Sequence, residues 1–173
     1  MNGRGMLYTA AVLVASGSGS AAAVTVTSPF CSTTAKVTST TYFLCTGSTH
    51  TAVDIGGVAC GDTFRAPFRG NYYYQYYSGC ATTCATDSTC NGGAGNYYVV
   101  TGASGWDFRI LNINPTTSSR SQTCDGCVLG AAGGHVHFDN RQYGTRKSAW
   151  YTSVGLTCGA SAYCGTVLGN ATL

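Results

Sequence analysis

The sequence contains no glutamate, so every acidic side chain belongs to one of six aspartates. A thermolysin-like H-E-x-x-H metal site is therefore impossible, and so is a glycosidase built on a pair of glutamates. The spacing of the aspartates indicates no catalytic pair, and no G-x-S-x-G segment is present for a serine hydrolase. Charged residues make up only 9% of the chain, and its net charge of +3 is not gathered into a basic patch. We therefore expect no nucleic-acid partner.

The sequence also lacks an apolar run long enough to cross a membrane. The run at residues 6–15, about 10 to 12 residues at most, falls short of the ~20 that spanning requires. Arg4 precedes it and Ala21-Ala22-Ala23 follows it, a pattern typical of a secretory signal peptide. We predict a signal peptide over residues 1–23 and one domain over residues 24–173. The mature protein is then expected to be secreted and extracellular, a monomer with no membrane contact.

Ten cysteines are many for a chain of 173 residues. In an exported protein they predict a disulfide framework. The spacings in Cys80–Cys84 and Cys124–Cys127 also occur in structural zinc sites and redox motifs, but an oxidising compartment favours disulfides. Local bridges from Cys31 to Cys45 and from Cys158 to Cys164 are possible, and the sequence alone does not choose among the pairings.

The composition favours strands, and no segment has a sustained helical period of apolar residues. We predict a mostly β, antiparallel fold with two long disulfide-held loops at residues 80–95 and 115–132. Glycines at 102 and 105 fit a hairpin turn between two of the strands. The expected strands are 24–27, 37–44, 72–77, 97–101, 106–113, a short strand that begins at 136–138, and 150–156.

The tyrosine-rich segment 72–77 has five tyrosines around one glutamine. Because side chains alternate along a strand, only one face of it can be exposed. That face could stack against glycan rings or form an aromatic wall of a peptide groove. The alternative is that one face belongs to the core and the other only fills the sheet surface.

The chain has only three histidines, and their placement points to a metal site. His135 and His137 would project from the same face of one strand. His50 and Asp54 can reach the same point if their strand lies beside it. Two imidazoles and one carboxylate leave a tetrahedral Zn²⁺ ion a fourth position for water, as in catalytic zinc sites. The remaining histidine, His135, would be free to act on that water.

These segments resemble those of the lysostaphin-type zinc endopeptidases, which cleave glycyl peptide bonds in bacterial cell walls. The segment His50-Thr-Ala-Val-Asp54-Ile is similar to the motif H-x-G-V-D-I of that family, with alanine in place of glycine. Gly134-His-Val-His-Phe-Asp139 resembles G-P-H-L-H-F-E. Between them, residues 61–70 and 95–100 are similar to two further segments, in the same order as in the family.

The resemblance implies an antiparallel sheet of the lysostaphin-type peptidase domain and a Zn²⁺ cofactor. According to this resemblance, His50, Asp54 and His137 would be the zinc ligands and His135 a catalytic histidine. The expected substrates are peptidoglycan peptides or other glycine-rich proteins, hydrolysed by zinc-activated water.

The sequence departs from the family pattern at Asn112, where a second catalytic histidine is usual. Asparagine can donate a hydrogen bond to an oxyanion but cannot transfer a proton. In addition, residues 124–130 replace two glycine-glutamine turns of the family. Two other functions therefore stay open: a catalytically weak or inactive domain that serves as a cell-wall-binding or scaffold module, and a disulfide-rich adhesin with incidental histidines.

Overall fold

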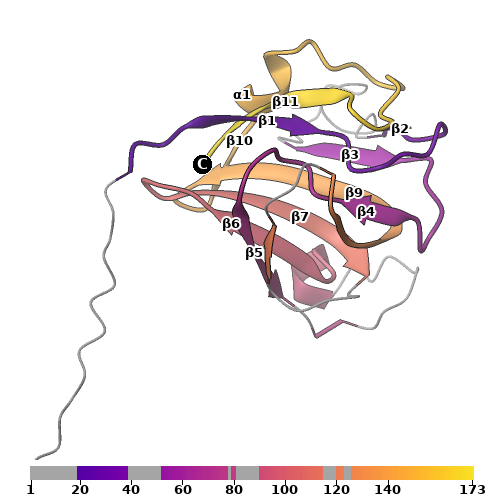
Figure 1. Ribbon diagram of the computed structural model, residues 1–173, viewed down its shortest axis with the longest axis horizontal. Coiled ribbons are helices and arrows are strands. Elements are labelled where there is room, and N and C mark those ends of the chain that lie inside the picture. The colour runs from indigo at the N-terminus through magenta and orange to yellow at the C-terminus, as the bar shows by residue number, and fades with distance from the viewer. Residues whose placement is uncertain (1–18, 39–51, 78, 81–89, 115–119, 123–125) are drawn as a thin grey trace, which may run out of the picture.

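The computed structural model describes residues 19–38, 52–77, 79–80, 90–114, 120–122 and 126–173. The fold is mostly β and its strands pair antiparallel, which confirms the predicted fold class (Figure 1). The elements in chain order are β1 (Ala23–Thr27), β2 (Lys36–Val37), β3 (Val53–Gly56), β4 (Thr63–Arg65), β5 (Tyr72–Tyr77), the 3₁₀ turn η2 (Cys90–Gly93), β6 (Tyr97–Thr101), β7 (Trp106–Asn114), β8 (Arg120–Gln122), β9 (Val128–Gln142), β10 (Thr145–Lys147), α1 (Ala149–Thr152) and β11 (Val167–Thr172).

Most strands belong to one large sheet in the order β2-β3-β9-β7-β6-β5-β8, and β4 and β10 also pair with β9. The first and last strands, β1 and β11, form a separate two-stranded sheet. Figure 1 shows β1, β11 and α1 together on one side of the large sheet. The domain therefore has two layers with a core between them.

The longest strand, β9, organises the large sheet. It pairs with β7 along one edge and with β4, β3 and β10 in turn along the other. The ladder to β7 is interrupted, because Leu111 lies opposite His137 whereas Ile113 lies opposite Ala132. Asn112 sits at this bulge with a φ of 62°, a left-handed conformation that asparagine tolerates better than most residues. A side chain at Gly133 would meet the carbonyl oxygen of Asn112 at 2.9 Å, so glycine is needed there.

Aromatic side chains fill the space between the two layers. Phe108 on β7 packs edge-on against Trp150 of α1 and Phe68, with ring centroids 5.3 and 4.9 Å away. Phe138 on β9 stacks on Phe64 of β4. All five rings are at most 3% exposed, and burial of each contributes about 1.5–3 kcal/mol. This core fixes which face of β7 and β9 points inward.

Several of the predicted strands are confirmed, including both tyrosine-rich ones. Strands β5 and β6 have the predicted bounds, and the turn at residues 102–105 joins β6 to β7 as a hairpin. Of the strand expected at 37–44, only its first two residues lie in the described part. Within β5, Tyr72, Tyr74 and Tyr76 join the core, whereas Tyr73 and Tyr77 are exposed.

Two predictions were wrong. The strand expected at 150–156 is instead the short helix α1, which turns Trp150 and Tyr151 into the core, and the last strand is β11. The loop expected to run to residue 132 ends earlier, because β9 begins at Val128 rather than near Val136. Its first half is rich in glycine and alanine, which disfavour strands, but β4 and β7 pair with it from both sides.

The disulfides depart from the local pairings considered above. Cys31 is bonded to Cys164, so bridges from Cys31 to Cys45 and from Cys158 to Cys164 are excluded. The cause is the pairing of β1 with β11, which brings the residues after β1 beside those before β11. Cys80 is bonded to Cys90, as expected for a disulfide-held loop, and none of the described cysteines is free.

The first described residues already take part in the fold. Ala22 exchanges two backbone hydrogen bonds with Leu173, and Ala23 lies opposite Thr172. The end of the signal peptide at residue 23 stays a prediction, and most of that segment lies outside the described residues. In the part of the chain that the structure describes, no helix has the length and apolar character needed to cross a bilayer.

We expect the double substitution Cys31→Ser with Cys164→Ser to lower the free energy of unfolding by about 5 kcal/mol, because that bridge closes a long loop in the unfolded chain. The pair Cys80→Ser with Cys90→Ser is the matched control, and its loop of sequence separation 10, against 133, predicts a loss of about 3 kcal/mol. Urea unfolding of the oxidised proteins measures both. Equal losses would contradict this account.

Candidate functional site

The centre of the candidate site is a pair of side chains on neighbouring strands. Asp54 on β3 lies directly opposite His137 on β9, and Nδ1 of the imidazole is 2.7 Å from Oδ1 of the carboxylate. Both side chains are mostly buried, with exposed fractions of 10% for His137 and 14% for Asp54. Their flanking residues all point into the core on the other face of the sheet: Val53, Ile55, Val136 and Phe138. Strand alternation therefore places the polar pair on the outer face.

A buried carboxylate lies behind the imidazole. Oδ2 of Asp139 is 3.4 Å from Nε2 of His137, and the Asp139 side chain is fully buried. The guanidinium of Arg141 donates two hydrogen bonds to it, of 2.7 and 2.8 Å, and Arg146 donates a third of 2.9 Å. Burial raises the pKa of Asp139, but the hydrogen bonds and charges of Arg141 and His137 outweigh it and hold that pKa well below its ordinary value. Asp139 is therefore ionised at any pH near neutrality.

His137 thus stands between two carboxylates. Burial lowers its pKa, but the hydrogen bonds to Asp139 and Asp54 and the charges of both acids outweigh this, and the net pKa is raised. An ionised Asp139 favours the tautomer that keeps its proton on Nε2. The lone pair on Nδ1 then faces a carboxylate oxygen of Asp54, and such a pair of acceptors needs a proton or a metal cation between them.

This donor set fits a zinc ion. Imidazole nitrogen and carboxylate oxygen are both common zinc ligands, and a carboxylate behind the ligating histidine is a recurrent feature of zinc sites. The expected third ligand, His50, lies outside the described residues. Within the described residues, no group of three or more histidine, cysteine or aspartate side chains is placed to hold a metal. The structure therefore provides two of the three expected ligands as an adjacent pair.

His135 lies two residues before His137 on β9, so strand alternation directs both side chains to the same face of the sheet. Burial lowers the pKa of His135, Asp54 partly offsets this, and His137 lowers it further. Its imidazole is therefore neutral at pH 7. The four groups expected from the sequence thus include three that the structure brings to one region of the sheet.

Asn112 is held at the bulge next to Leu111, which lies opposite His137. Its backbone N–H donates to the carbonyl of Ala94, so η2 and the chain after it are anchored to this bulge. Asn112 therefore directly follows the residue that pairs with His137 in the ladder between β7 and β9.

Asp139, Arg141 and Arg146 were assigned no role from the sequence. A signal was available, because Asp139 follows His137 at the spacing that puts both on one face. The two arginines come from β9 and from β10, which pairs with it, so their convergence required the β9–β10 register.

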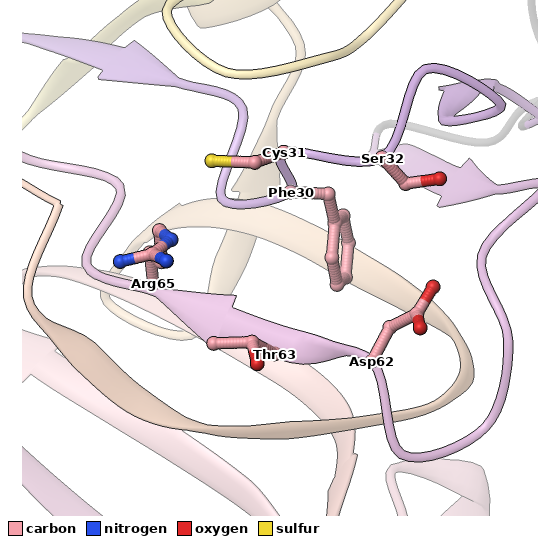
Figure 2. A pocket seen from close by; sticks show the side chains of 6 residues that line it. All are labelled: Phe30, Cys31, Ser32, Asp62, Thr63 and Arg65. Atoms are coloured by element: carbon pink, nitrogen blue, oxygen red, sulfur yellow. The ribbon is translucent and has the colours of Figure 1, made fainter.

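Among the described residues, two surface pockets lie away from the histidines. The first has a volume of about 290 Å³ (Figure 2) and is lined by Phe30, Cys31, Ser32, Asp62, Thr63 and Arg65. Its charged groups already hold loops, because Arg65 donates to the carbonyl of Gly126 and Asp62 accepts from the N–H of Ala59. The second has about 310 Å³ and lies over β5, β6 and β7; Tyr77, Tyr97, Val99, Thr101, Gly105, Trp106, Asp107 and Arg109 line it.

No protein-family model matches the chain, and no curated protein is similar to it. Among solved structures, the fold is similar to the crystal structure of a zinc containing peptidase from Vibrio cholerae, with 16% sequence identity and a TM-score of 0.39. The matched region covers 64% of this chain and 33% of that one. A likeness this distant shows neither a common family nor a common activity, so the function depends on the site's own residues.

We expect Asp139→Asn to lower the free energy of unfolding by about 3 kcal/mol, because it removes one partner of a buried charge cluster. Asp107→Asn is a matched control: Asp107 pairs with Arg109 at the same spacing, but its side chain is 17% exposed, so its loss should cost less than about 1 kcal/mol. The pKa of Asp139 is lowered on folding, so its contribution is present above about pH 4, the value for an unfolded aspartate, and is lost as the pH falls further.

Urea unfolding at pH 7 and at pH 3 measures both variants. The difference between Asp139→Asn and the unmodified protein should shrink at pH 3. A difference that stays constant with pH would show that the charge of Asp139 is not the cause.

Proposed function

We propose that the chain is a secreted zinc metalloendopeptidase that hydrolyses peptide bonds in peptidoglycan cross-links or in other glycine-rich peptides. The observation that carries this proposal is the 2.7 Å pair of His137 Nδ1 and Asp54 Oδ1, with Asp139 behind the imidazole. The resemblance of the segments around His50 and His137 to the lysostaphin-type endopeptidases supports the substrate class.

In this proposal each residue has a distinct role. His137, Asp54 and His50 hold the metal, and Asp139 keeps the imidazole of His137 in the orientation and tautomer that present Nδ1. Zn²⁺ bound there would polarise the scissile carbonyl and make water more acidic. His135 lies on the same strand as His137, where it can exchange a proton with the reacting groups.

Asn112 has the part of an oxyanion donor. Its side-chain amide can donate a hydrogen bond to the developing charge but cannot accept and return a proton. The left-handed backbone at residue 112 suits asparagine, and histidine is also among the residues enriched there. The second candidate function, a binding or scaffold module with little turnover, is favoured by this one residue.

Zinc content and activity should respond differently to the two late histidines. We expect His137→Ala to lose both the zinc and the cleavage of pentaglycine and cell walls, whereas His135→Ala should keep the zinc and lose at least about 10²-fold in turnover. Elemental analysis of the oxidised protein measures the metal, and release of glycine peptides measures cleavage. Unmodified protein without zinc would overturn the proposal, and protein with zinc but without cleavage would favour the binding module.

The substitution Asn112→His tests whether Asn112 limits turnover. A histidine at this position restores a group that can transfer a proton, and we expect kcat to rise by about 10²-fold, the lower range for one oxyanion-stabilising group. Asn112→Ala is the control, because it removes the amide and adds no imidazole, so its kcat should fall. A kcat that is equal in all three proteins would mean that residue 112 does not contact the reacting atoms.

A further inference from the structure

The face of the sheet that carries the candidate metal ligands continues as an aromatic surface. Paired residues of neighbouring strands share a face, and one such row runs across five strands: Tyr77 on β5, Tyr97 on β6, Leu111 on β7, His137 on β9 and Asp54 on β3. The second pocket, here called the tyrosine groove, lies at the β5 end of this row.

The tyrosine groove combines parallel rings with a polar pair. The rings of Tyr77 and Tyr97 are stacked, with centroids 4.8 Å apart and planes within 6° of each other. Trp106 also lines the groove and is partly exposed. Beside them, Nε of Arg109 donates to Oδ1 of Asp107 at 2.8 Å. The groove therefore offers flat apolar surface next to both a donor and an acceptor of hydrogen bonds.

The charge of this lining favours a neutral ligand. Asp107 and Arg109 are its only ionised residues, and they compensate each other. An anion would have to compete with Asp107 for the guanidinium, and a cation would have to compete with Arg109 for the carboxylate. A neutral ligand with many hydroxyl groups can instead use the remaining donors and acceptors of both.

An extended peptide backbone fits this place poorly. Peptides bind to sheets by adding a strand at a free edge. The groove lies over the face of β5, β6 and β7. Strands β6 and β7 have partner strands on either side, and β8 pairs with β5 over Tyr72–Tyr74, so the groove does not lie along a free edge of β6 or β7. What a sheet face of this kind can bind is a flat molecule that stacks on aromatic rings.

We propose that the tyrosine groove binds neutral sugar rings of a glycan chain, with one ring stacked on Tyr97, another ring further along the chain beside Trp106, and hydroxyl groups bonded to Asp107 and Arg109. Sugar rings present C–H bonds on their faces, which suit the negative π face of an aromatic ring. The proposal does not rest on the proposed peptidase activity, because none of these residues belongs to the metal pair.

The groove and the candidate metal centre are close enough to act on one polymer. Tyr97 is two strands away from His137, and Tyr77 three, so at about 4.8 Å a strand the distance is roughly 10 to 15 Å. Three or four peptide residues of about 3.3 Å each span that distance. A glycan in the groove could therefore carry a peptide that reaches His137.

Titration with chitotetraose, a neutral tetramer of N-acetylglucosamine, tests the proposal. Trp150 is 3% exposed in the core, so a change in tryptophan emission reports Trp106, the other tryptophan. We expect saturable binding with a Kd on the order of 1 mM or tighter. Tyr97→Ala and Asp107→Asn should each weaken it about tenfold. Tyr163→Ala, which removes an exposed tyrosine elsewhere, should leave it unchanged.

Calorimetry on the same samples confirms binding independently of fluorescence, and circular dichroism confirms that each variant is folded. His137→Ala and chelator-treated protein should bind chitotetraose as the unmodified protein does, so failure of the metal centre and failure of the groove are distinguishable. Absence of saturable binding, or equal weakening by Tyr163→Ala, would overturn the proposal. So would binding of pentaglycine, but not chitotetraose, in the groove.

Discussion

The register of β9 between β3 and β7 is the constraint on which the site depends. Phe138 must point into the core, and because side chains alternate along a strand, His137 then points outward and meets Asp54. A slip by one residue would bury His137 and expose the aromatic ring. Hydrophobic burial therefore holds the polar pair in place, although none of the pair's own interactions is hydrophobic.

The buried Asp139 adds a second kind of constraint. Removing a carboxylate from water is costly, and the bonds from Arg141 and Arg146 offset that cost without making the cluster a source of large net stability. The cluster fixes the orientation of His137. The arginines hold the carboxylate of Asp139 from one side, and the imidazole lies on its other side. The cost is consistent with a site whose geometry matters more than its contribution to folding.

The sequence was most informative where one physical effect dominates. Strands β5 and β6 are rich in tyrosine and valine, and their alternation or β propensity was sufficient to predict their bounds. The start of β9 was missed because its glycines and alanines carry no such signal, and only pairing with β4 and β7 makes it a strand. Trp150 was misassigned because aromatic residues are enriched in strands, whereas here its burial in the core comes from the short helix α1.

The features of the candidate site also differ in how far the sequence alone predicts them. The common face of His135 and His137 could be expected from their spacing, whereas the role of Arg146 required the register of β10 on β9. The bond between Cys31 and Cys164 joins residues 133 positions apart, and only the pairing of β1 with β11 makes them neighbours. Long-range contacts of this kind leave no trace in local composition.

That pairing of the first strand with the last has a consequence for how the protein is made. The layer that covers the core is assembled from β1 and β11, so residues 28–166 are synthesised between its two halves. Until β11 has been synthesised, the layer that packs over Phe108 and Phe138 is incomplete. Contacts between segments so far apart in the sequence form slowly. The core between the two layers can therefore close only after β11 has been synthesised.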